Sequence, residues 1–185
     1  MTSDGCSVTG KQRRKSRLIL VLGGAASGKS QVALDLAGRI GPRAFVATGQ
    51  ALDREMKVRI ERHQATRSSD WETAEVPTDL AKWFVDKGDS YRIIVLDCLT
   101  LWLSNLRGRR LRDVDVSEAT ATLLLAIRAT KARVVIVSNE LGLGLVPATK
   151  PVRAFRDLAG RVNQQVAAEA DEVYLTISGL PLRLK

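Results

Sequence analysis

Several large classes of protein are excluded by what this sequence does not contain. Its apolar runs all fall well short of the roughly eighteen residues that a membrane-spanning helix needs, so no such span is expected. Residues 1–17 have no apolar stretch of the kind found in a secretory signal. Cys6 and Cys98 are too few for a disulfide framework and suit a reducing compartment. We therefore expect a cytoplasmic protein.

Aromatic residues are also scarce, at 4% of the chain, although the formal net charge is +9. A charge of this sign suggests a nucleic-acid-binding ATPase, but such proteins stack bases on aromatic side chains. Part of the charge is local, because residues 1–16 form a basic segment with few apolar side chains and Arg107–Arg112 is typical of an arginine-rich loop. We expect a disordered tail over 1–16, one catalytic domain over 17–185 and no nucleic-acid partner, since polyphosphate substrates also favour positive charge.

What the sequence does contain is a phosphate-binding loop between a strand and a helix. Residues 23–30 fit the pattern G-x-x-x-x-G-K-[ST]. Leu18–Leu22 is an apolar run short enough for a buried parallel strand, and apolar residues recur at helical spacing after the loop until Gly41. Backbone N–H groups at such a helix N-terminus surround phosphate oxygens, so we expect the protein to bind a nucleoside triphosphate. The predicted phosphate-binding residues are Gly23, Gly24, Ala25, Ala26, Ser27, Gly28, Lys29 and Ser30.

Three positions carry distinct chemistry in this prediction. Lys29 should reach the β- and γ-phosphates, and the Ser30 hydroxyl should ligate Mg²⁺. Asp97 ends the apolar run that begins at Ile93, where a carboxylate would hold the same ion through water. Asn139-Glu140 ends another apolar run, and the sequence leaves two roles open for this pair: orienting a substrate or a water, or capping a loop.

Apolar runs and helical patterns alternate along the rest of the chain. This alternation favours an α/β fold with a mostly parallel, doubly wound sheet and an antiparallel C-terminal edge. Further strands are expected at 44–49, 71–76, 93–97 and 134–137, with a hairpin of 173–177 and 182–184. Helices are expected at 54–66 behind an Asp53 cap, from a Thr78 cap to Gly88, at 99–106, from Ser117 onward, and at 151–170.

His63 is the only histidine in the chain. A lone histidine on a helix is more often a surface or packing residue than a catalytic one. Arg59 and Arg67, four residues away on either side, would however share its face of the expected helix. A cationic face suits a phosphate and favours the neutral, nucleophilic imidazole. His63 could therefore attack a phosphate if its helix turns across the nucleotide.

Nearly all of residues 18–185 resembles the bifunctional adenosylcobinamide kinase / adenosylcobinamide-phosphate guanylyltransferase family of cobalamin biosynthesis. The P-loop pattern occurs in many families, whereas the expected helix around His63 and the matching segments after it are specific to this family. The matching segments are Gly23–Ser30; Ala47-Thr48 with Gln50–Asp53 and Glu55-Met56; Arg59-Ile60 with His63; Trp71 with Glu75; Asp97–Asn105; Val137–Glu140; Phe155–Gly160 with Asn163-Gln164; and Ala170–Val173 through Gly179–Leu182.

The resemblance implies a RecA-like P-loop fold, usually assembled as a homotrimer, and two reactions. One phosphorylates the aminopropanol hydroxyl of adenosylcobinamide with ATP or GTP. The other transfers GMP from GTP through a histidine-bound intermediate, giving adenosylcobinamide-GDP and pyrophosphate, and His63 falls on the guanylylated position. A carboxylate such as Glu75 could accept the N1–H and amino hydrogens of guanine. The nucleotide contacts implied in addition to the P-loop are Ala47, Thr48, Gly49, Gln64, Ala65, Thr66, Arg67, Glu75 and Asp97.

The sequence departs from the family at two positions. Family members often have arginine where this P-loop has Ala26, and proline where this chain has Ser68. Ala26 therefore removes a charge near the phosphates. The main alternative function is a different small-molecule kinase on the same scaffold, which would need no histidine nucleophile and would form no stable adduct with GMP.

Overall fold

The computed structural model describes residues 16–51, 54, 58, 69–109 and 111–185. The expected tail up to residue 15 and most of the expected helix at 54–66, His63 included, lie outside the described residues. Ser16 is buried, and its carbonyl oxygen accepts a hydrogen bond from Arg128 at 2.7 Å. The packed part of the chain therefore begins no later than Ser16.

Seven strands of the described chain form one sheet, in the order β3-β2-β4-β5-β1-β6-β7. Neighbouring strands are parallel from β3 to β6, and β7 runs antiparallel to β6. The predicted α/β sheet, mostly parallel with an antiparallel C-terminal edge, is confirmed. The strands are β1 Leu18–Gly23, β2 Arg43–Ala47, β3 Trp71–Glu75, β4 Ile93–Asp97, β5 Arg133–Asn139, β6 Glu172–Ile177 and β7 Leu180–Arg183.

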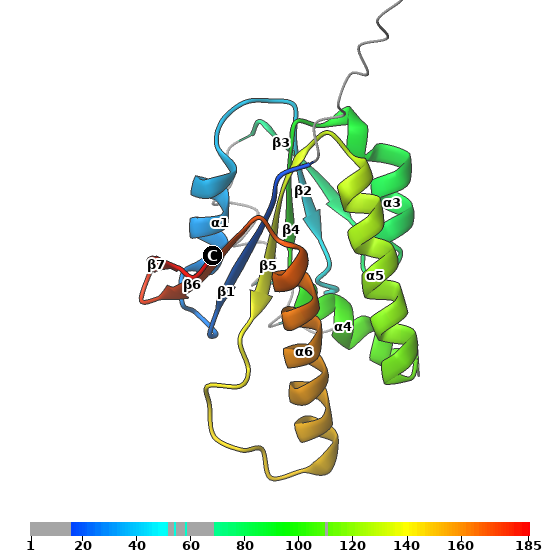
Figure 1. Cartoon of the computed structure of the whole chain (residues 1–185), viewed down its shortest axis with the longest axis vertical. Coiled ribbons are helices and arrows are strands. Elements are labelled where there is room, and N and C mark those ends of the chain that lie inside the picture. The colour runs from blue at the N-terminus through cyan, green and yellow to red at the C-terminus, as the bar shows by residue number, and fades with distance from the viewer. Residues whose placement is uncertain (1–15, 52–53, 55–57, 59–68, 110) are drawn as a thin grey trace, which may run out of the picture.

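Helices lie on both faces of this sheet, α1 on one face and α3, α4, α5 and α6 on the other (Figure 1). None of the helices in the described chain is both long and apolar enough to cross a membrane. The helices are α1 Lys29–Ala37, α3 Leu80–Lys87, α4 Leu99–Gly108, α5 Asp113–Ala129 and α6 Lys150–Glu169, with a short 3₁₀ helix at Gly88–Ser90.

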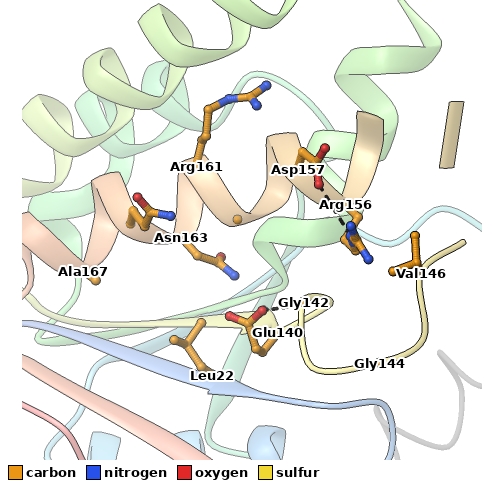
Figure 2. Close-up of a pocket in the computed structure, with 12 residues that line it drawn as sticks. Leu22, Glu140, Gly142, Gly144, Val146, Arg156, Asp157, Arg161, Asn163 and Ala167 are labelled. Carbon is orange, nitrogen blue, oxygen red and sulfur yellow. Dashed lines mark hydrogen bonds and ion pairs between the residues drawn. The ribbon is translucent and has the colours of Figure 1, made fainter. Parts of the chain in front are cut away.

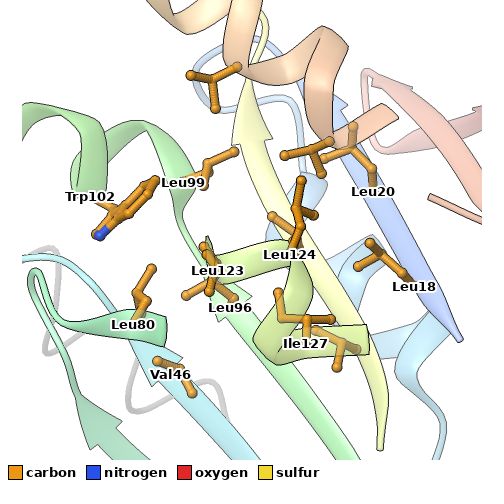
Figure 3. Packing of buried hydrophobic residues seen from close by; sticks show 14 of the residues in the cluster. Leu18, Leu20, Val46, Leu80, Leu96, Leu99, Trp102, Leu123, Leu124 and Ile127 are labelled. Carbon is orange, nitrogen blue, oxygen red and sulfur yellow. The ribbon is translucent and has the colours of Figure 1, made fainter. Parts of the chain in front are cut away.

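Strand β1 is buried on both of its faces. Leu18 and Leu20 pack into the larger apolar cluster, under α3 to α6 (Figure 3). Ile19 and Val21 pack into the smaller cluster, under α1. This division follows from the two-residue period of a strand, and it explains why β1 is a continuous apolar run without polar alternation. The P-loop thus begins on a strand that is fixed from both sides.

Helix α5 begins earlier than predicted. It begins at Asp113 because Asp115 caps its first turn: the Asp115 carboxylate accepts hydrogen bonds from the Arg112 backbone N–H at 2.8 Å and from the Arg112 guanidinium. Ser117, the predicted first residue, lies inside the helix. Arg107 belongs to the last turn of α4, so the predicted arginine-rich loop is reduced to a short connection.

Helix α3 also has a different N-cap residue from the one predicted. Asp79 occupies the N-cap position, and the helix begins at Leu80. The hydroxyl of Thr78 donates to the Asp79 carboxylate at 3.1 Å. The error is one residue, and it arises because Thr and Asp are both favoured N-cap residues.

Candidate active site

The P-loop leaves the carboxyl end of β1 and turns directly into α1. Lys29, the first residue of α1, is only 8% exposed, and its Nζ donates a hydrogen bond to the carbonyl oxygen of Gly24 at 2.8 Å. The loop also closes on itself, since the backbone N–H of Ser27 donates to the same carbonyl at 3.3 Å. The ammonium group is thus held within the loop, where the sequence predicts that it meets phosphate oxygens.

The C-terminal hairpin supports the P-loop from one side. Ser178 and Gly179 have φ values of 51° and 81°, as the two central residues of a tight type I′ hairpin turn require. The N–H of Gly179 donates to the carbonyl oxygen of Ser27 at 2.8 Å. A Cβ atom at Gly28, whose φ is +89°, would lie 3.0 Å from the Cα of Gly179. Gly28 is therefore required both by its backbone conformation and by this close approach.

Two features of the P-loop cost free energy when no ligand is bound, and we interpret both as signs of a ligand-binding site. Ala26 has a φ of 55°, a left-handed conformation that costs a non-glycine residue about 1–2 kcal/mol. The hydroxyl oxygen of Ser27 is buried and has no hydrogen-bond partner among the described residues. Strain and unsatisfied polar groups concentrate at binding sites, where a ligand offsets them.

Two alanine substitutions test the role of the hairpin contact. Gly28→Ala should lower the free energy of unfolding by about 1–3 kcal/mol, because it places an alanine in a left-handed backbone conformation with its Cβ against Gly179. Gly108→Ala is the matched control, since Gly108 lies at the end of α4, outside the P-loop, and a Cβ atom there has no neighbour within 4 Å. Thermal unfolding with and without a nucleoside triphosphate measures both effects, and we expect the stabilisation by nucleotide to be lost in Gly28→Ala only. Equal unfolding temperatures for the two variants would contradict the argument.

The ends of β2, β3 and β4 bring further predicted residues to the edge of the sheet that carries the P-loop. Ala47 pairs in register with Glu75 on one side and with Asp97 on the other. The hydroxyl of Thr48 donates to the carbonyl oxygen of Cys98 at 2.7 Å and accepts from the Cys98 N–H at 2.9 Å. The predicted nucleotide contacts Ala47, Thr48, Glu75 and Asp97 therefore share one edge with residues 23–30.

Asn105 is a positioning residue for this edge that sequence reasoning missed. Its Nδ2 donates to the carbonyl oxygens of Thr48 at 2.8 Å and Pro77 at 2.9 Å, so α4 holds the segments that follow β2 and β3. The segment 98–105 is mostly apolar, and its Leu99 and Trp102 are buried in the core. A polar amide within that apolar string was the available signal.

The donor set at this edge suits Mg²⁺. Ser30 lies in the first turn of α1 and Asp97 at the end of β4, with β5 as the single strand between β4 and β1. Strands two positions apart are separated by about 10 Å, a distance that phosphate oxygens and water can bridge. Within the described residues no group of three or more His, Cys, Asp or Glu side chains could hold a metal ion. One hydroxyl and one carboxylate fit an ion that usually keeps several waters and binds substrate phosphates.

Cys98 lies next to Asp97 but is chemically inert. Burial, and then the neighbouring Asp97 carboxylate, raise the pKa of the Cys98 thiol to about 11. Because the thiolate is the nucleophilic form, this thiol is unreactive near neutral pH. Covalent chemistry at the site therefore has to use another residue.

A second hydrogen-bond network joins β5 to α4 and α6. Asn163, 4% exposed on α6, accepts from the Ser138 hydroxyl at 2.7 Å and donates to the Asn139 carbonyl oxygen at 3.1 Å. Thr100 accepts from the Asn139 N–H at 2.9 Å. The carboxylate of Glu140 accepts from the Gly142 N–H at 2.8 Å, which is the loop-capping role that the sequence left open.

Glu140 also lies beside the P-loop. It lines a pocket of about 800 Å³ that also contains Leu22, the residue before the P-loop (Figure 2). Its backbone N–H donates to the carbonyl oxygen of Gly23 at 3.0 Å. Glu140 therefore contacts both the first residue of the P-loop and Gly142 in the loop that follows β5. His63 and Gln64–Arg67 lie outside the described residues, so their position in the site stays a prediction.

A buried P-loop lysine and a carboxylate at the same edge of a parallel sheet define a P-loop nucleotide-binding protein of the α/β class. Sequence comparison then assigns the family. The profile of the cobinamide kinase / cobinamide phosphate guanyltransferase family matches residues 19–184. The chain belongs to this family.

Individual relatives match over almost their whole length. A protein named bifunctional adenosylcobalamin biosynthesis protein CobU from Escherichia coli K12 is 38% identical over 180 residues, covering 91% of this chain and 99% of the relative. The CobU protein of Salmonella typhimurium matches to the same extent. A relative named CobP from Pseudomonas aeruginosa is 40% identical over 169 residues, covering 90% of this chain and 96% of the relative.

Proposed function

We propose that this chain phosphorylates adenosylcobinamide and then transfers GMP from GTP to the resulting phosphate, as its family membership implies. The observation that carries the proposal is the family match over residues 19–184, and the P-loop supports it, with Lys29 buried inside the loop and Asp97 at the same edge of the sheet. Both reactions handle a nucleoside triphosphate, so one phosphate-binding loop can serve both.

The first reaction is a phosphoryl transfer that needs positioning and charge stabilisation. The aminopropanol oxygen of the corrinoid forms a bond to the γ-phosphorus of ATP or GTP, and the bond from that phosphorus to the β-phosphate oxygen breaks. Lys29 and the backbone N–H groups of the loop stabilise the charge on the phosphates. Ser30 and Asp97 would hold Mg²⁺, which neutralises phosphate charge when it is bound.

The second reaction is a nucleotidyl transfer through His63. An imidazole nitrogen attacks the α-phosphorus of GTP, and pyrophosphate leaves. The phosphate of adenosylcobinamide phosphate then takes the GMP group from the histidine, giving adenosylcobinamide-GDP. The family resemblance supports His63 in this role, and the raised pKa of the Cys98 thiol argues against Cys98 as the nucleophile. Glu75, exposed at the end of β3, is proposed to accept hydrogens from guanine.

The remaining parts of the proposal rest on the sequence and on the resemblance to the family. They are assembly as a homotrimer, a cytoplasmic location, dependence on Mg²⁺, nucleotide contacts from Gly49 and Gln64–Arg67, and folding of residues 17–185 as one catalytic domain behind a tail.

Labelled GTP tests the function directly. Incubation with GTP labelled at the α-phosphate should leave label on the denatured protein, whereas a γ-label should not remain bound to it. Added adenosylcobinamide should accept a γ-phosphate, and its phosphorylated form should then remove the α-label from the protein. A protein that phosphorylates a small molecule and never retains the α-label would instead be a simple P-loop kinase. Stimulation of triphosphate hydrolysis by DNA or RNA would favour the nucleic-acid alternative.

A further inference from the structure

The pocket beside the P-loop has no part in the nucleotide chemistry described above. It lies between the end of β1, the loop that follows β5, and α6 (Figure 2). Leu22 and Glu140 line the side next to the P-loop, and Gly142, Gly144 and Val146 line the loop side. Because the Glu140 N–H binds the Gly23 carbonyl at 3.0 Å, the pocket adjoins the first residue of the P-loop.

Helix α6 contributes one continuous face to this pocket. Its lining residues recur at intervals of three and four, which places them along a single side of the helix. Most of them also fall in the family-specific segments Phe155–Gly160 and Asn163-Gln164, which the nucleotide chemistry described above does not use. The residues of α6 in the pocket are Arg156, Asp157, Gly160, Arg161, Asn163, Gln164 and Ala167.

The polar groups of the pocket are mostly neutral or already paired. Asn163 is held by the network with Ser138 and Asn139 and keeps one amide hydrogen to donate. The amide of Gln164, exposed on α6, has no hydrogen-bond partner in the part of the chain that the structure describes. The guanidinium of Arg161 binds Asp113 at 2.7 Å. Arg156, whose side chain is 21% exposed, lies 3.5 Å from the Asp157 carboxylate. Such a lining suits a large, mostly uncharged ligand better than a second triphosphate.

We propose that this pocket binds the corrinoid acceptor in both reactions, an inference that rests on the proposed function. Cobinamide carries several carboxamide side chains, and the amides of Asn163 and Gln164 can form paired hydrogen bonds with them. The aminopropanol end of the acceptor points toward the P-loop, beside Glu140. Arg156 is available to the phosphate that this end acquires in the first reaction.

Gly160 gives a way to fill the pocket without disturbing the fold. A Cβ atom at Gly160 has no neighbouring atom within 4 Å outside its own helix, so a larger side chain projects into open space. Leucine and alanine both favour a helix more than glycine does. Gly160→Leu and the matched control Gly160→Ala should therefore unfold at the same temperature as the unchanged protein or above it.

The two variants should differ in their use of the corrinoid only. We expect Gly160→Leu to raise the KM for adenosylcobinamide by about tenfold or more, equivalent to about 1.4 kcal/mol of lost binding, and Gly160→Ala by about threefold at most. Labelling of the protein by α-labelled GTP without corrinoid should be unchanged in both. If the unchanged protein itself neither labels nor uses corrinoid, the proposed function fails. If it does both, and Gly160→Leu has the same KM or loses the labelling while folded, the pocket assignment is overturned.

A second pair of variants probes the amides. Gln164→Leu should raise the KM for adenosylcobinamide about threefold to tenfold, because it removes a hydrogen-bonding group from the pocket. Gln165→Leu is the matched control, because Gln165 lies next along the helix and its Nε2 donates to the Ser117 carbonyl oxygen on α5 at 3.3 Å. Equal KM values for these two variants would contradict corrinoid binding through Gln164.

Discussion

Lys29→Ala is expected to lower the rates of both reactions by about 10²–10³-fold, the usual cost of removing one preorganised charge-stabilising group from an active site. The Lys29 ammonium is held in the loop by the Gly24 carbonyl at 2.8 Å. We propose that it binds the β- and γ-phosphates, which carry charge in the kinase step and leave as pyrophosphate in the guanylyl transfer. Assays of γ-phosphate transfer and of labelling by α-labelled GTP measure the two losses.

The fold should survive this substitution. Burying an ammonium is costly, and the Gly24 carbonyl lies at an exposed position where water can replace the lost donor. Thermal unfolding should therefore change little. Lys82→Ala is the matched control, since Lys82 is exposed on α3 and pairs with Asp86 at 2.7 Å, and both activities should be unchanged. Normal turnover of either reaction by Lys29→Ala would show that the two reactions do not share the loop.

His63→Ala is expected to separate the two reactions. Labelling by α-labelled GTP and formation of adenosylcobinamide-GDP should fall below detection, because the variant has no imidazole to attack the α-phosphorus. Phosphorylation of adenosylcobinamide should fall by no more than about tenfold, since Lys29, Ser30 and Asp97 supply most of its charge stabilisation. The adduct on the unchanged protein should be labile in acid and stable in base, as a phosphoramidate is.

Cys98→Ala is the control for this experiment. Its thiol is buried and has a pKa of about 11, so its removal should leave the labelling intact. If His63→Ala still acquires the α-label, the nucleophile is another residue. If His63→Ala loses both activities equally while folded, the segment around His63 binds the nucleotide in general, and the proposed division of roles is wrong.

The strand, P-loop and helix at residues 18–37 were predictable from the sequence because the motif is local. Glycines at fixed spacing, an apolar run before them and helical periodicity after them determine this unit without any distant contact. The mostly parallel sheet was predictable for a related reason, since strands alternate with helices along the chain. The start of α5 was not predicted, because an arginine can cap a helix through its partner Asp115 and the preferred N-cap residue Ser117 can lie inside one.

The contacts that complete the site depend on residues far apart in the sequence. The role of Asn105 becomes visible only when α4 lies across the ends of β2 and β3. The pocket is lined both by Glu140, just after β5, and by Gly160 on α6, and a sequence pattern does not show that these two segments come together. The segments that match the family include Asn105, Glu140 and Gly160, but a sequence match does not show what these residues contact.

The sheet order also affects how the protein can fold during its synthesis. Strand β1 is made early, but Leu18 pairs with Val134 and Ile19 with Glu172, so both neighbours of the strand leave the ribosome much later. Until then the strand has neither of its hydrogen-bonded neighbours, and its apolar side chains are only partly covered by earlier segments such as α1, a condition in which nascent chains aggregate or bind chaperones. The P-loop is likewise incomplete until late in synthesis, because the Gly179 N–H that binds the Ser27 carbonyl belongs to the turn between β6 and β7. ATP and GTP therefore cannot stabilise the growing chain through a finished P-loop until that turn has been made.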